Sequence, residues 1–361
     1  MKTGRTLQEL AEELDRQNTA KRDLLVDTGA LHMYEASEND FNRVSLRVGA
    51  AGNYEQFDIN DVAHGQIGSH LKIPAAYYNR MREEMPSLLA ENVNSWFFKK
   101  PDTRRMLRTL DGTARAFLSS RYRCIDNYEI AQTVLPIIGN MPGAKIQSCE
   151  LTDSKMYLKV VDPRLETEIV KGDAVQAGVI ISNSEVGHGS VSVHPLLFRL
   201  ICSNGMIAAD EGLRKYHVGR INESGDSDYE IYRDATIEAD DRAFLMKLED
   251  TVNAAVNEAQ FLKIVDRLRD STQAKIDPIH VPQVVELAAK EFNITQNEGK
   301  GILGHLIEGG ELSLYGLGNA VTRHAKDVES YDRSTELEHV GFKIITMAPH
   351  LWKRINAQVA S

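Results

Sequence analysis

The sequence predicts an α+β fold, in which an antiparallel sheet with a basic β-hairpin is backed by helices and followed by a helical C-terminal domain. Three observations predict it. Alternating apolar segments dominate the first part of the chain, helical periodicity dominates the last part, and an acidic, polar segment at 220–234 separates them. We therefore expect an α+β domain over residues 1–229 and an acidic helical domain over residues 230–361.

The elements follow from capping, turn and periodicity signals. In the first domain, Asn60 or Asp61, Pro74, and Asp126 or Asn127 mark helix starts, and Asp111-Gly112 is the strongest hairpin turn in the chain. The expected helices are 7–21, 63–71, 75–85 and 128–139, and the expected strands are 42–49, 106–110, 114–120, 145–151, 155–161, 174–182 and 189–202. In the second domain we expect helices at 235–270, 281–292, 298–308, 316–328 and 336–358.

Composition is that of an ordinary soluble globular protein, with 361 residues, 42% hydrophobic and 26% charged. A net charge of −10 argues against a protein that coats nucleic acid indiscriminately. Cys124, Cys149 and Cys202 lie far apart, so neither a disulfide framework nor a zinc ribbon is expected. The amphipathic N-terminus does not resemble a signal peptide and no apolar run could span a membrane, so we expect a cytoplasmic protein without membrane contact.

The segment from Trp96 to Cys124 opposes this acidic balance. It holds eight cations and two acids, a local charge of +6, and the aromatic residues Trp96, Phe97, Phe98, Phe117 and Tyr122 lie among them. Cations that bind phosphates and rings that stack on bases are the two requirements of a single-stranded nucleic-acid site. Period-two geometry places Arg104 and Arg108 on one face of the first hairpin strand and Arg105 on the other.

These features predict a basic groove that binds nucleic acid, with Phe117 and Tyr122 stacking on bases. A strand at 155–161 would present two further cations outward. The predicted binding residues are Lys99, Lys100, Arg104, Arg105, Arg108, Arg115, Phe117, Arg121, Tyr122, Arg123, Lys155 and Lys159. The alternative is that several of these arginines pair with the acidic remainder of the chain and hold the sheet to the helical domain.

No motif predicts a catalytic residue, a metal site or a cofactor. His188 and His194 have an even spacing but would lie at opposite ends of a strand, about 20 Å apart, too far for one ion. A nucleophilic site would pair Cys202 or Ser184 with a histidine, but no nucleophile-elbow motif surrounds either residue. In the helical part, polar residues at helical spacing predict contacts to a neighbouring helix or subunit, with a ligand site as the alternative: Asn319, Thr322, Arg323 and His324.

Four blocks resemble the phage- and plasmid-like family of domain of unknown function 932: RAFLSSRYRCIDNYEI, ISNSEVGHGSVSVHPLLFRLICSNGM, KYHVGRI and GLGNAVTRHAKDV. The resemblance extends over roughly residues 30–340. It implies a setting in the DNA metabolism of mobile elements and supplies no catalytic residues. The order of elements is also similar to that of Rad52-type annealing proteins, which form rings around a basic groove, although fold order alone does not establish function.

The leading hypothesis is a non-enzymatic single-stranded DNA-binding protein, an annealing or recombination accessory of a phage or plasmid that acts as a homo-oligomer, for which a ring is one arrangement. The sequence does not separate DNA from RNA. The alternatives are a factor that binds a host or phage protein, as an inhibitor or regulator, and a metal-dependent hydrolase around His188, His194 and Cys202.

Overall fold

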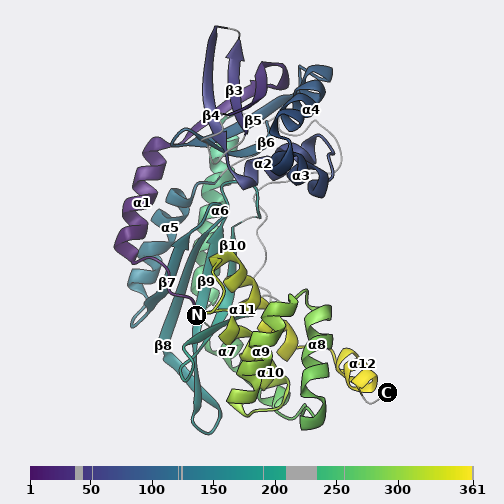
Figure 1. Cartoon of the computed structure of the whole chain (residues 1–361). Coiled ribbons are helices and arrows are strands. Elements are labelled where there is room, and N and C mark those ends of the chain that lie inside the picture. Colours follow the sequence, from purple (N-terminus) through teal and green to yellow (C-terminus); the bar gives the residue numbers. More distant parts are fainter. Residues whose placement is uncertain are drawn as a thin grey trace.

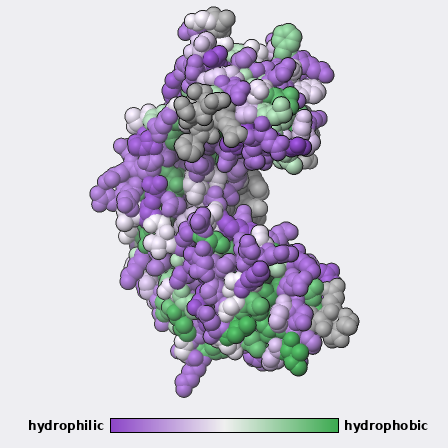
Figure 2. Space-filling model, in the orientation of Figure 1, coloured by the Kyte–Doolittle hydropathy of each residue, from purple (hydrophilic) through white to green (hydrophobic). Residues whose placement is uncertain are grey.

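The computed structural model describes residues 1–36, 44–50, 52–120, 122, 125–189, 191–208, 234–255 and 257–359. Two β-sheets follow one another along an elongated molecule, and helices cover both (Figure 1). Figure 2 shows the surface hollowed on one side, between the lobe that carries α2–α4 and the C-terminal helices. No helix among the described residues is long and apolar enough to cross a membrane.

The first sheet has six strands in the order β1-β5-β6-β4-β3-β2. Its strands are β1 (Arg22–Asp27), β2 (Leu31–Glu35), β3 (Val44–Ala50), β4 (Asn53–Ile59), β5 (Arg104–Leu110) and β6 (Thr113–Ser119). One face is covered by α2 (Asp61–His70), α3 (Ala75–Glu84) and α4 (Pro86–Lys99), which bury Ile67, Tyr78 and Phe97 against Leu107 and Phe117. The β5–β6 hairpin therefore lies in the middle of a sheet and does not project from an edge.

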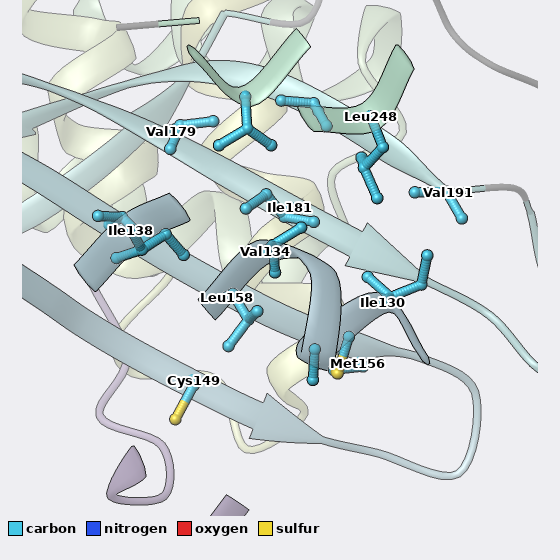
Figure 3. Packing of buried hydrophobic residues seen from close by; sticks show 14 of the residues in the cluster. Ile130, Val134, Ile138, Cys149, Met156, Leu158, Val179, Ile181, Val191 and Leu248 are labelled. Atoms are coloured by element: carbon cyan, nitrogen blue, oxygen red, sulfur yellow. The ribbon is translucent and has the colours of Figure 1, made fainter. Parts of the chain in front are cut away.

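The second sheet is an antiparallel meander of five strands in the order β11-β10-β9-β8-β7. Its strands are β7 (Lys145–Leu151), β8 (Met156–Val170), β9 (Asp173–Asn183), β10 (Ser192–Arg199) and β11 (Asn204–Ile207). α1 (Leu7–Ala20), α5 (Asn127–Asn140) and α6 (Asp234–Ala255) bury one face. In Figure 3, Val134 and Ile138 of α5 lie over Leu158 and Ile181 of the sheet.

The remaining helices cover the rest of this sheet and extend beyond it. α7 (Glu258–Ser271) packs on β8, while α10 (Leu314–His324) and α11 (Tyr331–Ile345) pack on the edge strand β11. The other face of the meander, with Tyr157 and Ile180, packs against Tyr331 of α11. α8 (Val281–Glu291), α9 (Gln296–Gly309) and α12 (Pro349–Val359) complete the helical end.

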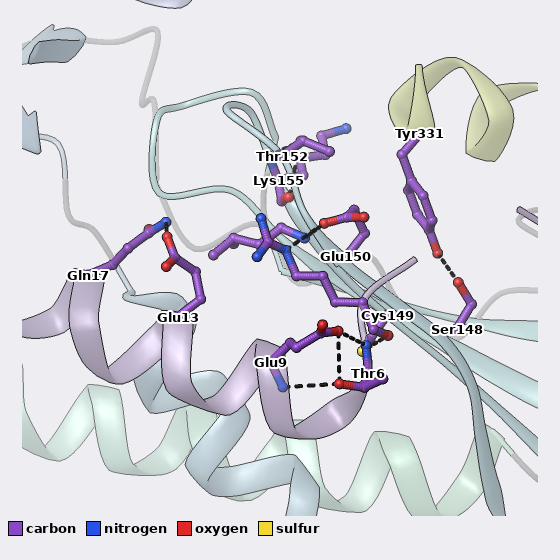
Figure 4. Close-up of polar contacts among 12 residues, drawn as sticks. Thr6, Glu9, Glu13, Gln17, Ser148, Cys149, Glu150, Thr152, Lys155 and Tyr331 are labelled. Atoms are coloured by element: carbon purple, nitrogen blue, oxygen red, sulfur yellow. Dashed lines mark hydrogen bonds and ion pairs between the residues drawn. The ribbon is translucent and has the colours of Figure 1, made fainter. Parts of the chain in front are cut away.

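Polar contacts fix α1 and α11 to the edge strand β7. Thr6 and Glu9 form a capping box at the start of α1, and the Nε of Arg5 lies 2.8 Å from Glu150 Oε1. Ser148 and the Tyr331 hydroxyl are 2.7 Å apart (Figure 4). Both contacts join segments more than 140 residues apart, so β7 is held by elements from both ends of the chain.

The predicted α+β class is confirmed, but the strands form two sheets and not one, and β4 pairs with β6 in parallel in the first sheet. The helix expected at 235–270 is two helices, because Asn257 caps the start of α7, and the one expected at 336–358 is also two, because Pro349 begins α12. Helix α4 and strands β1, β2, β4 and β11 were not predicted. The domain boundary near residue 230 stays a prediction, since residues 209–233 lie outside the described part. After it, α6 and α7 contact the second sheet.

Candidate nucleic-acid interface

The predicted hairpin is confirmed in its turn and its alternation. Leu110 pairs with Thr113 across Asp111 and Gly112, whose φ angles of 50° and 78° are those of the tight turn that Asp-Gly favours. Arg105 and Leu107 point to the helices, while Met106 and Arg108 point to the other face. Both faces are covered, however, because α2–α4 pack on one face and the loop after β9, with Val186, packs on the other.

On the helical face, Arg105 packs against an aromatic core residue. Its guanidinium lies 4.8 Å from the centre of the Phe117 ring and donates a hydrogen bond to the Phe117 carbonyl at 3.3 Å. Phe117 itself is buried between Phe97 and His70. Burial lowers the pKa of Arg105. The predicted stacking role of Phe117 is therefore wrong, since its ring is already enclosed by protein.

On the opposite face, Arg108 is the largest fully buried side chain among the described residues, with 1% exposure. Its Nε lies 2.7 Å from Asp23 Oδ1, its Nη2 lies 2.8 Å from Asp126 Oδ1, and its Nη1 donates to the Glu185 carbonyl at 2.9 Å. Burial alone would raise the pKa of Asp126, but hydrogen bonds from Lys21 and Arg108 outweigh it and hold that pKa below its ordinary value.

A β-bulge turns Arg115 toward the same network. Arg108 pairs with Ala116 and Thr109 with Ala114, so Arg115 is the extra residue of the hairpin. Its Nη2 lies 2.8 Å from Glu185 Oε2, while Glu185 Oε1 accepts a hydrogen bond from the backbone N–H of Asn127 at 2.5 Å. This network joins the first sheet to the start of α5 and to the loop after β9. These arginines form internal ion pairs, as the alternative interpretation predicted, but they hold the first sheet to α5 and the loop after β9 and not to the helical domain.

The predicted groove is therefore wrong for the residues that are enclosed. Lys159 has no exposed surface, because its Nζ lies 2.7 Å from Glu338 Oε2 and 4.6 Å from the centre of the Tyr331 ring. Burial lowers the pKa of Lys159 and raises that of Glu338. Tyr122 is half-buried against Leu118, and Lys155 is half-buried near Gly189. Arg121 and Arg123 lie outside the described residues.

Of the predicted cations that the structure describes, three are exposed, and they lie where α4 ends and β5 begins. Pro86 at the first turn and the buried stripe Leu89, Ala90, Val93 and Phe97 explain why this segment is a helix. We define the α4–β5 corner as Trp96, Phe98, Lys99, Lys100 and Arg104, all of which are exposed. Phe98 is 85% exposed and Trp96 44%. Sequence reasoning noted both rings but left them out of the predicted site.

Helix geometry orders these side chains around the last turn of α4. Successive residues are rotated by about 100°, so Trp96 and Phe98 flank the buried Phe97 on either side. Lys99 then lies between the two rings on the outward half of the turn. Its Nζ is 4.9 Å from the centre of the Trp96 ring. An ammonium between two accessible rings matches the pairing of phosphate and base contacts that single strands require.

A family model described as "Domain of unknown function (DUF932)" matches residues 116–339, more than half of the chain. The chain belongs to the DUF932 family. A search of curated proteins and a search of solved structures each found no match. The likeness to Rad52-type annealing proteins therefore has no support. The DUF932 match begins within β6, so the α4–β5 corner precedes it.

The hydrolase alternative predicted one site around His188, His194 and Cys202. His194 packs edge-to-face on His339, with ring centres 5.6 Å apart, whereas Cys202 follows the far end of β10 and contacts Arg199. His188 lies in the loop before β10, where burial lowers its pKa. Among the described residues, the group that could hold a metal ion lies elsewhere, at His305, His324 and Asp327.

Proposed function

We propose that this chain binds single-stranded DNA through the α4–β5 corner and serves strand annealing or recombination in a mobile element. The observation that carries the proposal is the outward half-turn of α4, where Lys99 lies between the exposed rings of Trp96 and Phe98. Annealing requires no bond chemistry, only strands held with their bases accessible. The proposal places the protein in the cytoplasm, where it would meet such strands.

One corner is a small binding site. Each stacked base contributes about 1–3 kcal/mol, and the three lysine and arginine side chains can neutralise about three phosphates. Several copies on one strand would bind far more tightly, because each further contact becomes intramolecular. We therefore extend the proposal to a homo-oligomer, for which a ring is one arrangement. Stacking on rings does not distinguish DNA from RNA.

The test is fluorescence anisotropy of a labelled strand of about 30 nucleotides, a length that spans several sites. The variant Phe98→Ala/Lys99→Ala should weaken binding at least about fivefold, since one stacked base is worth at least about 1 kcal/mol. The matched control is Tyr77→Ala/Arg80→Ala, which removes an exposed ring and a cation from the neighbouring helix α3. An RNA strand of the same sequence tests nucleic-acid class.

Two outcomes would contradict the proposal. In the first, the wild-type protein gives no anisotropy change at low salt. In the second, both double variants bind as well as the wild type. The first outcome would favour the alternative, a factor that contacts a host or phage protein, for which the 85% exposed Phe98 ring is the observation. Size-exclusion chromatography with and without the strand measures the oligomeric state.

A further inference from the structure

A second group of chemically active side chains lies at the helical end, where α9 and α10 pack side by side (Figure 1). His305 Nε2 is 2.7 Å from Asp327 Oδ2, and His324 Nδ1 is 3.5 Å from the same oxygen. One donor atom from each of the three residues lies within 4.8 Å of the other two. Two imidazoles and a carboxylate thus converge on one point.

Local structure explains the convergence. His324 ends α10, and the Asp327 amide donates to the His324 carbonyl at 2.9 Å, so the turn after α10 brings the carboxylate back to the helix end. Gly301 of α9 makes room for the imidazole. A Cβ at position 301 would lie 2.5 Å from His324 Nδ1, closer than such atoms approach. Any larger residue would move the His324 ring.

A second carboxylate lies behind the first histidine. Glu308 Oε2 is 3.8 Å from His305 Nδ1, the nitrogen that faces away from Asp327, and Arg323 holds that oxygen at 3.0 Å. Histidines that bind a metal through one nitrogen commonly direct the other toward a carboxylate, which fixes the tautomer and the ring orientation. Glu308 has the position of such an outer partner.

We propose that His305, His324 and Asp327 bind a divalent transition-metal ion, for which Zn²⁺ fits the donor set. Two imidazoles and one carboxylate favour zinc and its neighbours over Mg²⁺ or Ca²⁺, which prefer oxygen ligands alone. Bonds of about 2.0–2.1 Å in a tetrahedron place ligand atoms about 3.3–3.4 Å apart, so the 3.5 Å separation fits as it stands. The 2.7 Å contact would lengthen by about 0.6 Å as the ion replaces the shared proton.

Three protein ligands leave one position of a tetrahedral ion for water. The Asp327 side chain is 53% exposed, so solvent reaches the cluster. Zinc sites with three protein ligands and one open position are typical of catalysis, whereas structural zinc sites have four protein ligands. The site lies in the region matched by the family model and is separate from the α4–β5 corner.

The test uses the full-length protein, stripped with a chelator and titrated with Zn²⁺ against a competing indicator dye. We expect one equivalent bound, and a loss of at least about tenfold in affinity for His324→Ala and Asp327→Asn. Asp327→Asn keeps an oxygen that accepts the His305 proton, so it separates ion binding from the hydrogen bond. Glu308→Gln should weaken binding about 10–100-fold, the usual effect of an outer partner.

Two further variants sharpen the result. Gly301→Ala should weaken zinc binding by displacing His324, while circular dichroism verifies that α9 remains folded. The matched control is His350→Ala, an exposed histidine of α12 outside the cluster, which should bind zinc as the wild type does. A wild-type protein that takes up no zinc would overturn the proposal. So would equal affinity in Asp327→Asn and the wild type, or a loss of zinc in His350→Ala.

Discussion

Replacing Arg108 by methionine tests whether the basic hairpin is structural. The change keeps an unbranched apolar stem but removes the cation, so Asp23 and Asp126 each lose a partner. Removing one member of a buried ion pair costs about 3–5 kcal/mol. Asp126 keeps Lys21, and the Asp23 side chain is 38% exposed, so we expect the lower end, about 3 kcal/mol of unfolding free energy.

The assay is urea unfolding followed by circular dichroism and by the fluorescence of the two tryptophans, of which Trp96 lies in the lobe of the hairpin. The matched control is Arg104→Met on the same strand. Arg104 is exposed, so this change should alter stability by no more than about 0.5 kcal/mol. Unchanged stability in Arg108→Met together with lost strand binding would refute the structural role.

Three further predictions concern salt, pH and the second buried ion pair. Three cations in the α4–β5 corner predict a slope of about −2 for the logarithm of the binding constant against the logarithm of salt concentration. Strand affinity should therefore fall about 15–20-fold between 50 and 200 mM salt. The ten cations of the predicted groove would instead give a slope of about −7. Burial lowers the pKa of His64 and of His339 to about 3, so the unfolded chain takes up protons at a higher pH than the folded protein. The free energy of unfolding should therefore fall as pH drops from 6.5 toward 3, by up to about 1.4 kcal/mol per pH unit for each histidine. In urea titrations at a series of pH values, His64→Gln should make this dependence weaker. Lys159→Met alone should cost about 3–5 kcal/mol in the same titration, whereas Lys159→Met with Glu338→Leu should come close to the wild type, because no unpaired charge stays buried.

Features that depend on neighbouring residues could be predicted from the sequence. The Asp111-Gly112 turn sets the register of β5 and β6, and β7 has the predicted bounds, Lys145–Leu151. Asn60 caps α2 as expected, through a hydrogen bond from the Ala63 amide to its side chain. The turn and the cap act over four residues or fewer and the strand pattern over seven, so no knowledge of the rest of the chain is needed.

The environment of the hairpin could not be predicted, because it depends on distant residues. The alternation of side chains along β5 predicted correctly which residues share a face, but it did not predict which parts of the chain cover those faces. Arg108 meets Asp23 and the Glu185 carbonyl, which are 85 and 77 residues away. Those contacts require β1 to pair with β5 and the loop after β9 to approach the sheet. A cluster of arginines within an acidic chain is equally consistent with an open groove and with internal ion pairs.

Helix α4 was missed for a different reason. Its N-terminal proline and apolar stripe are ordinary helix signals, but the cations at its end continue into the basic run of the hairpin, and the predicted groove included both. Treated as a helix, the segment would have placed Phe97 inside and Trp96, Phe98 and Lys99 outside. The exposed rings would then have replaced Phe117 as the predicted stacking residues.

The two proposed sites make separable claims about the family and about this chain. The family match begins at residue 116, after the α4–β5 corner, and includes His305, His324 and Asp327. A function shared through the matched region would therefore not depend on the corner. If the corner variants abolish strand binding while zinc affinity is unchanged, the two sites act independently in this chain. If Asp327→Asn also weakens strand binding, the two sites are coupled, because the exchange of one exposed carboxylate for an amide leaves the cations of the corner untouched.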